Sequence, residues 1–361
     1  MNARLDGVRE RLEQLGLDAL LVNSDENRRY LSGFTGSAGS LVITPRDAIL
    51  ATDFRYTEQA GQQAPDFRVL RIRSGMDWLM DLVKELNIQH LGFEEQHMTV
   101  SVHGNIQKAL GGIDSSNGIS LLPTANLIEN IRSVKDVQEL GILARAIEIS
   151  DLAFEEVFKT IRAGVTEIEV AWRLEKAMRE LGAEAVSFET IVAVGPNAAL
   201  PHHRPADQII GEGEPLIIDM GARYQGYCSD LSRTLFLGDP SDIFRKVYDT
   251  VLGAQLTAIA TVEKGMTGGD ADGLARTVIE EAGYGENFGH SLGHGIGLAV
   301  HEQPGVGPSS GVVLDDGMIF TIEPGIYISG WGGVRIEDVV LLEQGRARVM
   351  SKALKPDRMT T

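Results

Sequence analysis

The first 124 residues alternate between helix-type and strand-type spacing of apolar positions. Leu5, Val8, Leu12 and Leu15 recur every three or four residues, which predicts a helix that Gly16 ends. Short apolar runs that predict strands lie at residues 19–22, 41–43, 48–50, 67–72, 90–93 and 119–122, and helical patterns lie at residues 77–86 and 100–110. We therefore expect an α/β domain over residues 1–124.

The remaining residues, 125–361, begin with a long helical pattern and then mix helices with strands. The pattern extends over residues 125–161 and is interpreted as the crossover into a second domain. Thr166 and Glu169 have capping-box spacing, which predicts a helix to about Leu181 that Gly182 ends. Predicted strands lie at residues 186–194, 216–218, 234–237, 318–322, 326–328 and 339–342, and helices at 241–262 and 270–282. This predicts a second, α+β domain.

Composition excludes several classes of protein. The 361 residues are long enough for two domains, and the single cysteine, Cys228, cannot form an intrachain disulfide. Arginines interrupt the first 16 residues where a secretory signal would need an apolar run, so a cytoplasmic location is expected. No stretch approaches the roughly 20 apolar residues of a membrane span. The formal net charge of -18 disfavours nucleic acid and anionic membranes as partners.

Two segments of the second domain each end an apolar strand pattern with a carboxylate and a glycine. Residues 216–221 read LIIDMG, and residues 319–325 read IFTIEPG. A second acid follows each, since Asp230 lies 11 residues after Asp219 and Glu337 lies 14 residues after Glu323. An extended chain would separate the acids of a pair by about 36 Å or more. Only a hairpin brings each pair together.

Carboxylates within apolar strands are costly to bury unless a cation compensates them. The glycine-rich stretch at residues 288–301 contributes His294 and a backbone that can approach a metal closely. Four carboxylates and one imidazole suit two divalent ions such as Mn, Co or Zn, about 3.5 to 4 Å apart. The alternative interpretation is that these acids are ordinary strand charges that face solvent.

The motifs resemble those of the dinuclear metallopeptidases of the pita-bread fold: methionine aminopeptidase, prolidase and aminopeptidase P, with creatinase as a metal-free relative. The segments that carry the resemblance are IIDMGARYQGYCSDLSRT, GHSLGHGIG, TIEPGIYI and GVRIED. Residues 1–124 resemble the creatinase-type N-terminal domain, including YLSGFTG at 30–36 and ATDFRY at 51–56. The resemblance covers the whole chain and implies a pita-bread catalytic domain at residues 125–361.

The resemblance also assigns roles to individual residues. It implies that two divalent ions (Mn, Co or Zn) are bound and activate a hydroxide for attack on a peptide carbonyl. The implied metal ligands are Asp219, Asp230, His294, Glu323 and Glu337. Glu323 would double as the acid/base, with His202 and His301 contacting substrate or stabilising the tetrahedral intermediate.

Further side chains are assigned with alternatives left open. His290 is expected to bind substrate. Arg335 is expected to bind substrate, to orient a carboxylate ligand, or to form a plain surface ion pair. Adjacent strand residues point to opposite faces, so only one of His202 and His203 should reach the metals. Arg46, Arg55, Arg204 and Arg335 are candidates to receive the carboxylate of a dipeptide.

The resemblance implies a metal-dependent Xaa-Pro exopeptidase, either a dipeptidase (prolidase) or an aminopeptidase P, that acts on short proline-containing peptides as a homodimer. A methionine aminopeptidase-like enzyme and a catalytically silent peptide-binding member of the fold stay open as alternatives. A monozinc HExxH protease is excluded, because Gly305 stands where the second histidine would be required after His301. A serine hydrolase is disfavoured by the lack of a G-x-S-x-G motif.

Overall fold

The computed structural model describes residues 3–73, 75–111 and 118–356, which form two compact units that divide between Arg132 and Ser133. Each unit combines helices with strands, as the sequence predicts, and each is described by itself. Among the helices in the described ranges, none is both long and apolar enough to cross a bilayer.

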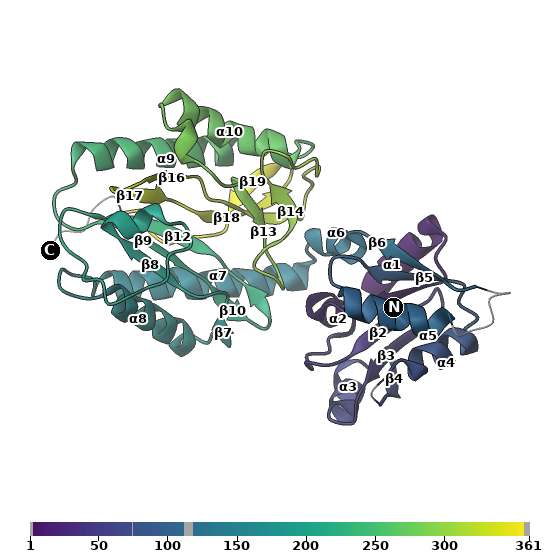
Figure 1. Cartoon of the computed structure of the whole chain (residues 1–361). Helices are drawn as coiled ribbons and strands as arrows, with labels where there is room; N and C mark the ends of the chain where they lie inside the picture. The colour runs from purple at the N-terminus through teal and green to yellow at the C-terminus, as the bar shows by residue number, and fades with distance from the viewer. Residues whose placement is uncertain (1–2, 74, 112–117, 357–361) are drawn as a thin grey trace. The chain divides into compact units, whose positions relative to one another are not determined.

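The N-terminal unit is built on a six-stranded sheet of order β4-β3-β2-β1-β5-β6 (Figure 1). β2 pairs antiparallel with β1 and β3, whereas the pairs β3–β4, β1–β5 and β5–β6 are parallel. The strands are β1 Ala19–Val22, β2 Ser40–Ile43, β3 Ala48–Thr52, β4 Arg68–Arg71, β5 His90–Glu94 and β6 Ser120–Thr124. The helices are α1 Ala3–Leu15, α2 Asp25–Ser32, α3 Thr57–Gln63, α4 Asp77–Glu85, α5 Val100–Gly111 and α6 Leu127–Ser133.

Two differences from the expected elements have local causes. The short helices α2 and α3 are additional, because their sequences are largely polar and carry little apolar periodicity. The helical pattern expected over residues 125–161 is two helices, α6 and α7 (Val137–Phe158). Asp136 separates them as the N-cap of α7, since its carboxylate accepts from Glu139 N while the Glu139 side chain accepts from Asp136 N.

Over residues 133–356, the C-terminal unit contains four small sheets and four long helices. The strands are β7 Ala185–Val186, β8 Ile191–Val194, β9 Pro215–Met220, β10 Ala222–Tyr224, β11 Tyr227–Cys228, β12 Leu231–Phe236, β13 Gly293–Gly295, β14 Glu302–Val306, β15 Ile319–Ile322, β16 Gly325–Ile328, β17 Gly332–Arg335, β18 Asp338–Glu343 and β19 Arg346–Val349. The helices are α7, α8 Glu167–Glu180, α9 Asp242–Thr261 and α10 Gly268–Glu281, with 3₁₀ turns η2 Gly195–Ala199 and η3 Gly285–Asn287.

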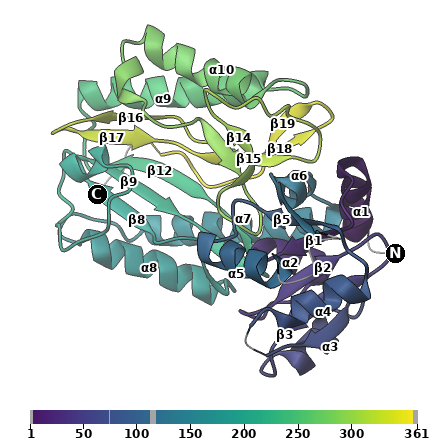
Figure 2. The ribbon, with the colours of Figure 1, turned by 45° about the vertical axis from the view of Figure 1, so that its right-hand side comes forward.

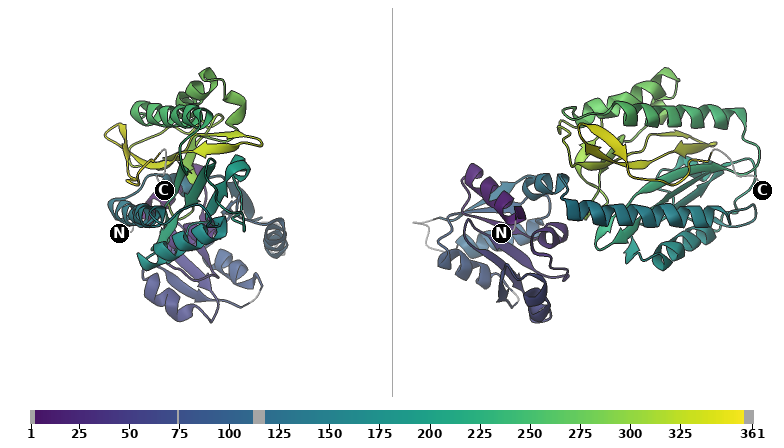
Figure 3. Two further views of the ribbon diagram at one scale, coloured as in Figure 1. Left: turned by 90° about the vertical axis from the view of Figure 1, so that its left-hand side faces the viewer. Right: turned by 180° about the vertical axis from the view of Figure 1, so that it is seen from behind.

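The strands of this unit lie between two helix pairs, α7 with α8 on one side and α9 with α10 on the other (Figures 1, 2 and 3). α7 and α8 share a buried apolar core with β8, β9 and β12. α9 and α10 share a second core with β15 to β18. The two cores hold the strands from opposite faces, which leaves the strand ends between them to carry polar side chains.

Two antiparallel pairings bring the acid-bearing segments together, as the hairpin argument predicts. β9 pairs with β12 so that Asp219 lies opposite Ser232, and β15 pairs with β18 so that Ile322 lies opposite Asp338. β13 pairs with both β14 and β15. A Cβ at Gly293 or Gly295 would collide with the backbone of Thr321 or Gln303, so glycine is required on both sides of the histidine of β13.

Candidate metal centre

Four strand ends and one strand centre supply the five predicted ligands. Asp219 lies within β9, and Asp230 directly precedes β12. His294 is the central residue of β13, and Glu323 and Glu337 follow β15 and β17. The Glu337 amide donates to the Ser232 carbonyl at 3.1 Å, which joins the two hairpins through the backbone.

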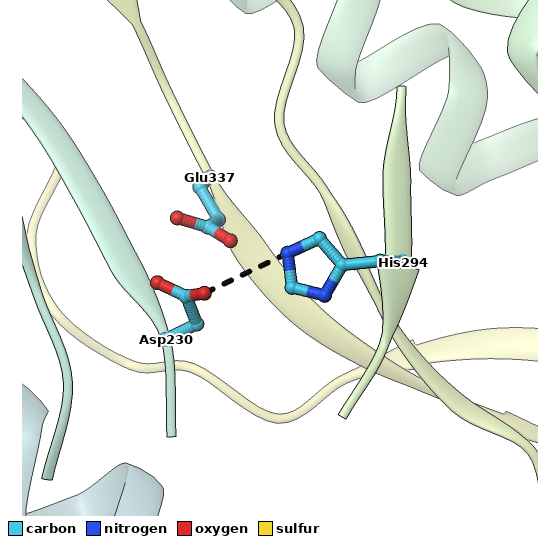
Figure 4. Close-up of side chains that lie close together, drawn as sticks. All are labelled: Asp230, His294 and Glu337. Carbon is cyan, nitrogen blue, oxygen red and sulfur yellow. Dashed lines mark ion pairs between the residues drawn. The ribbon is translucent and has the colours of Figure 1, made fainter. Parts of the chain in front are cut away.

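The ligand-type atoms converge on one place. Asp230, His294 and Glu337 offer atoms that all lie within 4.8 Å of one another, and Figure 4 shows these side chains pointing toward a common centre from different strands. His294 Nε2 is 3.7 Å from Asp230 Oδ2 and 3.2 Å from Glu323 Oε1. The imidazole therefore lies between carboxylates of both hairpins.

Asp219 is held beside this group by a buried guanidinium. Arg335 Nη2 donates to Asp219 Oδ2 at 2.6 Å, Nε donates to Ser232 Oγ at 2.8 Å, and Nη1 donates to Tyr327 Oη at 2.9 Å. The Arg335 side chain is only 4% exposed. These contacts match the carboxylate-orienting role among the alternatives for Arg335, although the carboxylate is Asp219 and the donors are largely committed to protein partners.

Burial and crowding of like charges set the proton affinities here. Burial, reinforced by the charges of Glu337 and Asp219, raises the pKa of Asp230 well above its usual value. Burial, reinforced by Glu323 and Asp219, raises the pKa of Glu337 in the same way. Burial also opposes ionisation of Glu323. The hydrogen bond and the charge of His294 outweigh the effect of burial, so the pKa of Glu323 is lowered. A divalent cation would favour the ionised form of every carboxylate.

The donor set fits a divalent metal. Asp219 Oδ1 and Glu337 Oε1 are buried and have no hydrogen-bond partner among the residues that the structure describes. A buried carboxylate oxygen without a donor is costly unless it binds a cation. Four carboxylates with one imidazole form the oxygen-rich set that borderline divalent ions accept.

A cavity of about 710 Å³ opens onto the cluster. Asp219, Asp230, His294 and Glu323 lie in its wall, together with the sequence-predicted His202, His290, His301 and Arg335. The rings of His294 and His301 are in edge contact, with centroids 4.2 Å apart. Burial, with the charge of His294, lowers the pKa of His301. The structure thus brings every predicted site residue except the more deeply placed Glu337 to one cavity wall.

His203 and Tyr327 have partners that the sequence pattern does not indicate. His203 also borders the cavity, but its Nε2 donates to the buried Glu167 Oε2 at 2.8 Å. Tyr327 Oη contacts His290 Nε2 at 2.9 Å and accepts from Arg335 Nη1, so it links a cavity histidine to the Arg335–Asp219 pair. A tyrosine in a strand is ordinarily core, and only the fold places this one at the site.

Comparison with known proteins is consistent with this arrangement. Residues 141–344 match metallopeptidase family M24, and residues 4–134 match the creatinase/prolidase N-terminal domain. The chain belongs to metallopeptidase family M24. This confirms the resemblance noted in the sequence, together with the expected pairing of a creatinase-type N-terminal domain and a pita-bread domain.

Individual M24 relatives cover nearly the whole chain. The chain is 43% identical to the solved Xaa-Pro dipeptidase of Bacillus anthracis, with a TM-score of 0.93 over 99% of both chains. It is 38% identical to the X-Pro aminopeptidase of Thermotoga maritima MSB8, with a TM-score of 0.89 over 99% of both chains. It is 40% identical to the uncharacterized peptidase YqhT of Bacillus subtilis (strain 168), over 98% of both chains. Membership of M24 implies a divalent metal, for which Asp230, His294 and Glu337 form a candidate site.

Proposed function

We propose that this chain is an exopeptidase that hydrolyses the peptide bond preceding proline in short peptides. The observation that supports this most strongly is the convergence of four carboxylates and His294, all except Glu337 in the wall of one cavity, with two buried carboxylate oxygens left without donors among the described residues. Relatives named for Xaa-Pro substrates align along the full length of both units. A catalytically silent member of the fold would not need to bury uncompensated carboxylates.

The five predicted ligands would hold two divalent ions, Mn, Co or Zn. Bound ions of this kind supply a nucleophile from water at neutral pH and polarise the substrate carbonyl. Asp219, Asp230, His294, Glu323 and Glu337 would together hold the ions. Arg335 would fix the orientation of the Asp219 carboxylate from behind, as outer hydrogen-bond partners of metal ligands do.

The remaining side chains at the cavity would move protons and stabilise charge. Glu323 Oε1 accepts from Thr321 Oγ1 at 3.2 Å and contacts His294 Nε2, which holds the carboxylate where it would take a proton from the attacking water and pass it to the proline nitrogen. His301 and His202 would donate to the oxygen that becomes negative as the carbonyl is attacked. His290, linked to Tyr327, would bind the substrate backbone.

Two of the candidate arginines, both in the C-terminal unit, lie where they could receive the carboxylate of a dipeptide. Of the four candidate arginines, Arg204 and Arg335 border the cavity. Arg335 is committed to Asp219, whereas Arg204 is 82% exposed and its Nε lies 3.3 Å from Glu189 Oε2. Among the arginines of the C-terminal unit, Arg204 is therefore the one that a dipeptidase would use. A longer peptide would leave this pair undisturbed and continue outward, so dipeptidase and aminopeptidase P activities both stay in the proposal.

Comparison of substrates tests the proposal. Protein stripped with EDTA and reloaded with Mn, Co or Zn should cleave Ala-Pro or Ala-Pro-Ala, and the ratio of the two rates distinguishes the two activities. Met-Ala is the control substrate, because preferential release of its methionine would identify a methionine aminopeptidase instead. Full turnover after exhaustive stripping would contradict the metal mechanism, and hydrolysis of none of these peptides would favour a silent peptide-binding member.

The assembly of the protein is a separate part of the proposal. The family resemblance favours a homodimer. Size-exclusion chromatography with light scattering should then give twice the chain mass of 39.1 kDa. A monomer mass would contradict it.

A further inference from the structure

A fully buried glutamate lies at the start of α8. Glu167 is 0% exposed, and both carboxylate oxygens are saturated by donors from one connected segment. Oε1 accepts from Val194 N and from Asn197 Nδ2, each at 2.9 Å. Oε2 accepts from His203 Nε2 at 2.8 Å and from Ala206 N at 3.2 Å. One carboxylate therefore makes hydrogen bonds to four residues of the segment from 194 to 206.

This segment connects His202 to β8, the strand that pairs with the Asp219-bearing strand β9. It starts at the end of β8, whose residue Ile191 lies opposite Asp219 of β9, and it continues through η2. η2 packs closely against β17, so closely that a Cβ at Gly333 would collide with the Ala198 carbonyl. The turn that follows places His202 at the cavity, and the bonds of Glu167 to Asn197 and His203 lie on either side of that residue in the chain.

We propose that Glu167 is a positioning residue that holds the turn at 200–206 so that His202 faces the reaction centre, with His203 as its anchor. Four hydrogen bonds to one charged group are worth more than four neutral ones, and none of them can be replaced by water at a site that is fully buried. The division of labour between the adjacent histidines follows, because His203 binds Glu167 and His202 is left for substrate. The inference rests on the proposed role of His202.

A purely structural role for Glu167 is the competing explanation. An acidic residue in the first turn of a helix stabilises that helix through its dipole whatever else it contacts. Glu169 is the matched control, since it lies in the same turn of α8 but is exposed and pairs with Arg173. Glu167→Gln and Glu169→Gln remove the same charge from the same helix end, and only the first disturbs the turn that carries His202.

The amide of Glu167→Gln cannot satisfy the same donors. In either orientation, its NH₂ group faces two donors, either Val194 N with Asn197 Nδ2 or His203 Nε2 with Ala206 N. We expect kcat/KM on Ala-Pro peptides to fall about tenfold, as for loss of a charge-assisted hydrogen bond, with Glu169→Gln close to wild type. In a His202→Asn background, the same Glu167 change should alter kcat/KM less than about twofold, because residues that act as a unit are non-additive.

Amide hydrogen exchange supplies a readout that does not depend on turnover. Exchange of amides in residues 200–206 should accelerate in Glu167→Gln and stay at the wild-type rate in Glu169→Gln, while the centre of α8 stays protected in both. If Glu167→Gln folds poorly, His203→Phe is the substitute variant, because it removes one of the four donors to Glu167. It should lower kcat/KM and accelerate amide exchange in residues 200–206, each by less than Glu167→Gln. This variant leaves the buried carboxylate in place.

The outcomes separate the two proposals. The positioning role would be overturned if the loss of kcat/KM in Glu167→Gln added fully to the loss in His202→Asn. Unchanged amide hydrogen exchange in residues 200–206 of Glu167→Gln would overturn it too. Failure of the wild-type protein to cleave any Xaa-Pro peptide would overturn the proposed function instead, and amide exchange would still decide whether Glu167 holds the turn.

Discussion

Glu337 directly precedes β18 and Asp338 is the first residue of that strand, yet the two carboxylates belong to different clusters of buried charge. Both are 1% exposed. Asp338 accepts from Arg233 Nη2 at 2.9 Å and pairs with Lys355 Nζ at 2.5 Å, and Gln255 Nε2 lies 3.4 Å away. Arg233 in turn donates to the carbonyls of the C-terminal segment. This structural charge cluster is complete within the protein.

The cluster around Glu337 is incomplete by the same measure. One oxygen of Glu337 has no donor among the described residues, and its neighbours Asp230 and Glu323 are also acidic. The nearby guanidinium of Arg335 is directed at Asp219. Because unpaired buried charge opposes folding, the difference supports the proposal that a bound cation compensates the repulsion at Glu337. Two adjacent residues thus belong to a structural charge cluster and to the candidate metal centre.

The largest expected effect is the loss of activity in Glu337→Gln. Removal of a proposed metal ligand should lower kcat/KM about a thousandfold or more at the metal concentration that saturates the wild type. The metal-free variant should melt no lower than metal-free wild type, since one repulsive charge is gone. Thermal unfolding with and without Mn measures both points, because added Mn should raise the Tm of wild type far more than that of the variant.

A Glu337→Gln protein that keeps activity within tenfold of wild type, or that melts well below metal-free wild type, would break the comparison. The first result would remove Glu337 from the ligand set, and the second would place it in the structural charge cluster.

Asp338→Asn is the matched change one residue away and should have the opposite profile. It leaves Arg233 buried without its carboxylate, which costs about 3–5 kcal/mol in the free energy of unfolding. Urea unfolding should show the loss as a lower midpoint. The kcat of the folded fraction should stay close to wild type. Unchanged stability would show that the arginine finds enough carbonyl acceptors without Asp338.

The sequence alone predicts the acid cluster better than it predicts what surrounds it. Asp219, Asp230, Glu323 and Glu337 stand out because charge interrupts apolar strand patterns, and pairing of those strands brings the acids together as expected. That they bind metal stays a prediction. His294 is found through the glycines on either side of it, which the packing of β13 requires.

The supporting contacts could not be predicted, because they join residues far apart in the chain. Asp338 and Arg233 are 105 residues apart, and Asp219 and Arg335 are 116 apart. Glu167 looks like an ordinary helix-start acid beside Thr166, and only the fold shows that it is fully buried. Local spacing carries the strand and cap patterns, whereas the choice of partner for a buried charge depends on tertiary packing.

Arg335 lies between the two kinds of cluster, since it is a buried cation whose carboxylate belongs to the metal centre. Lysine keeps the charge but lacks the planar fork, so Arg335→Lys cannot bond to Asp219, Tyr327 and Ser232 together. We expect the affinity for Mn to fall about 10–100-fold, as for loss of an outer partner of a metal ligand, with kcat partly restored at saturating Mn.

Arg348→Lys is the control for this change, because Arg348 pairs with Glu343 at the surface, with both side chains about half exposed, and should tolerate the exchange. Calorimetric titration with Mn measures the affinity directly, and activity against free Mn checks it. A wild-type affinity for Mn in Arg335→Lys would contradict this prediction. It would mean that a positive charge alone holds Asp219 and that the three hydrogen bonds of Arg335 are not needed to orient it.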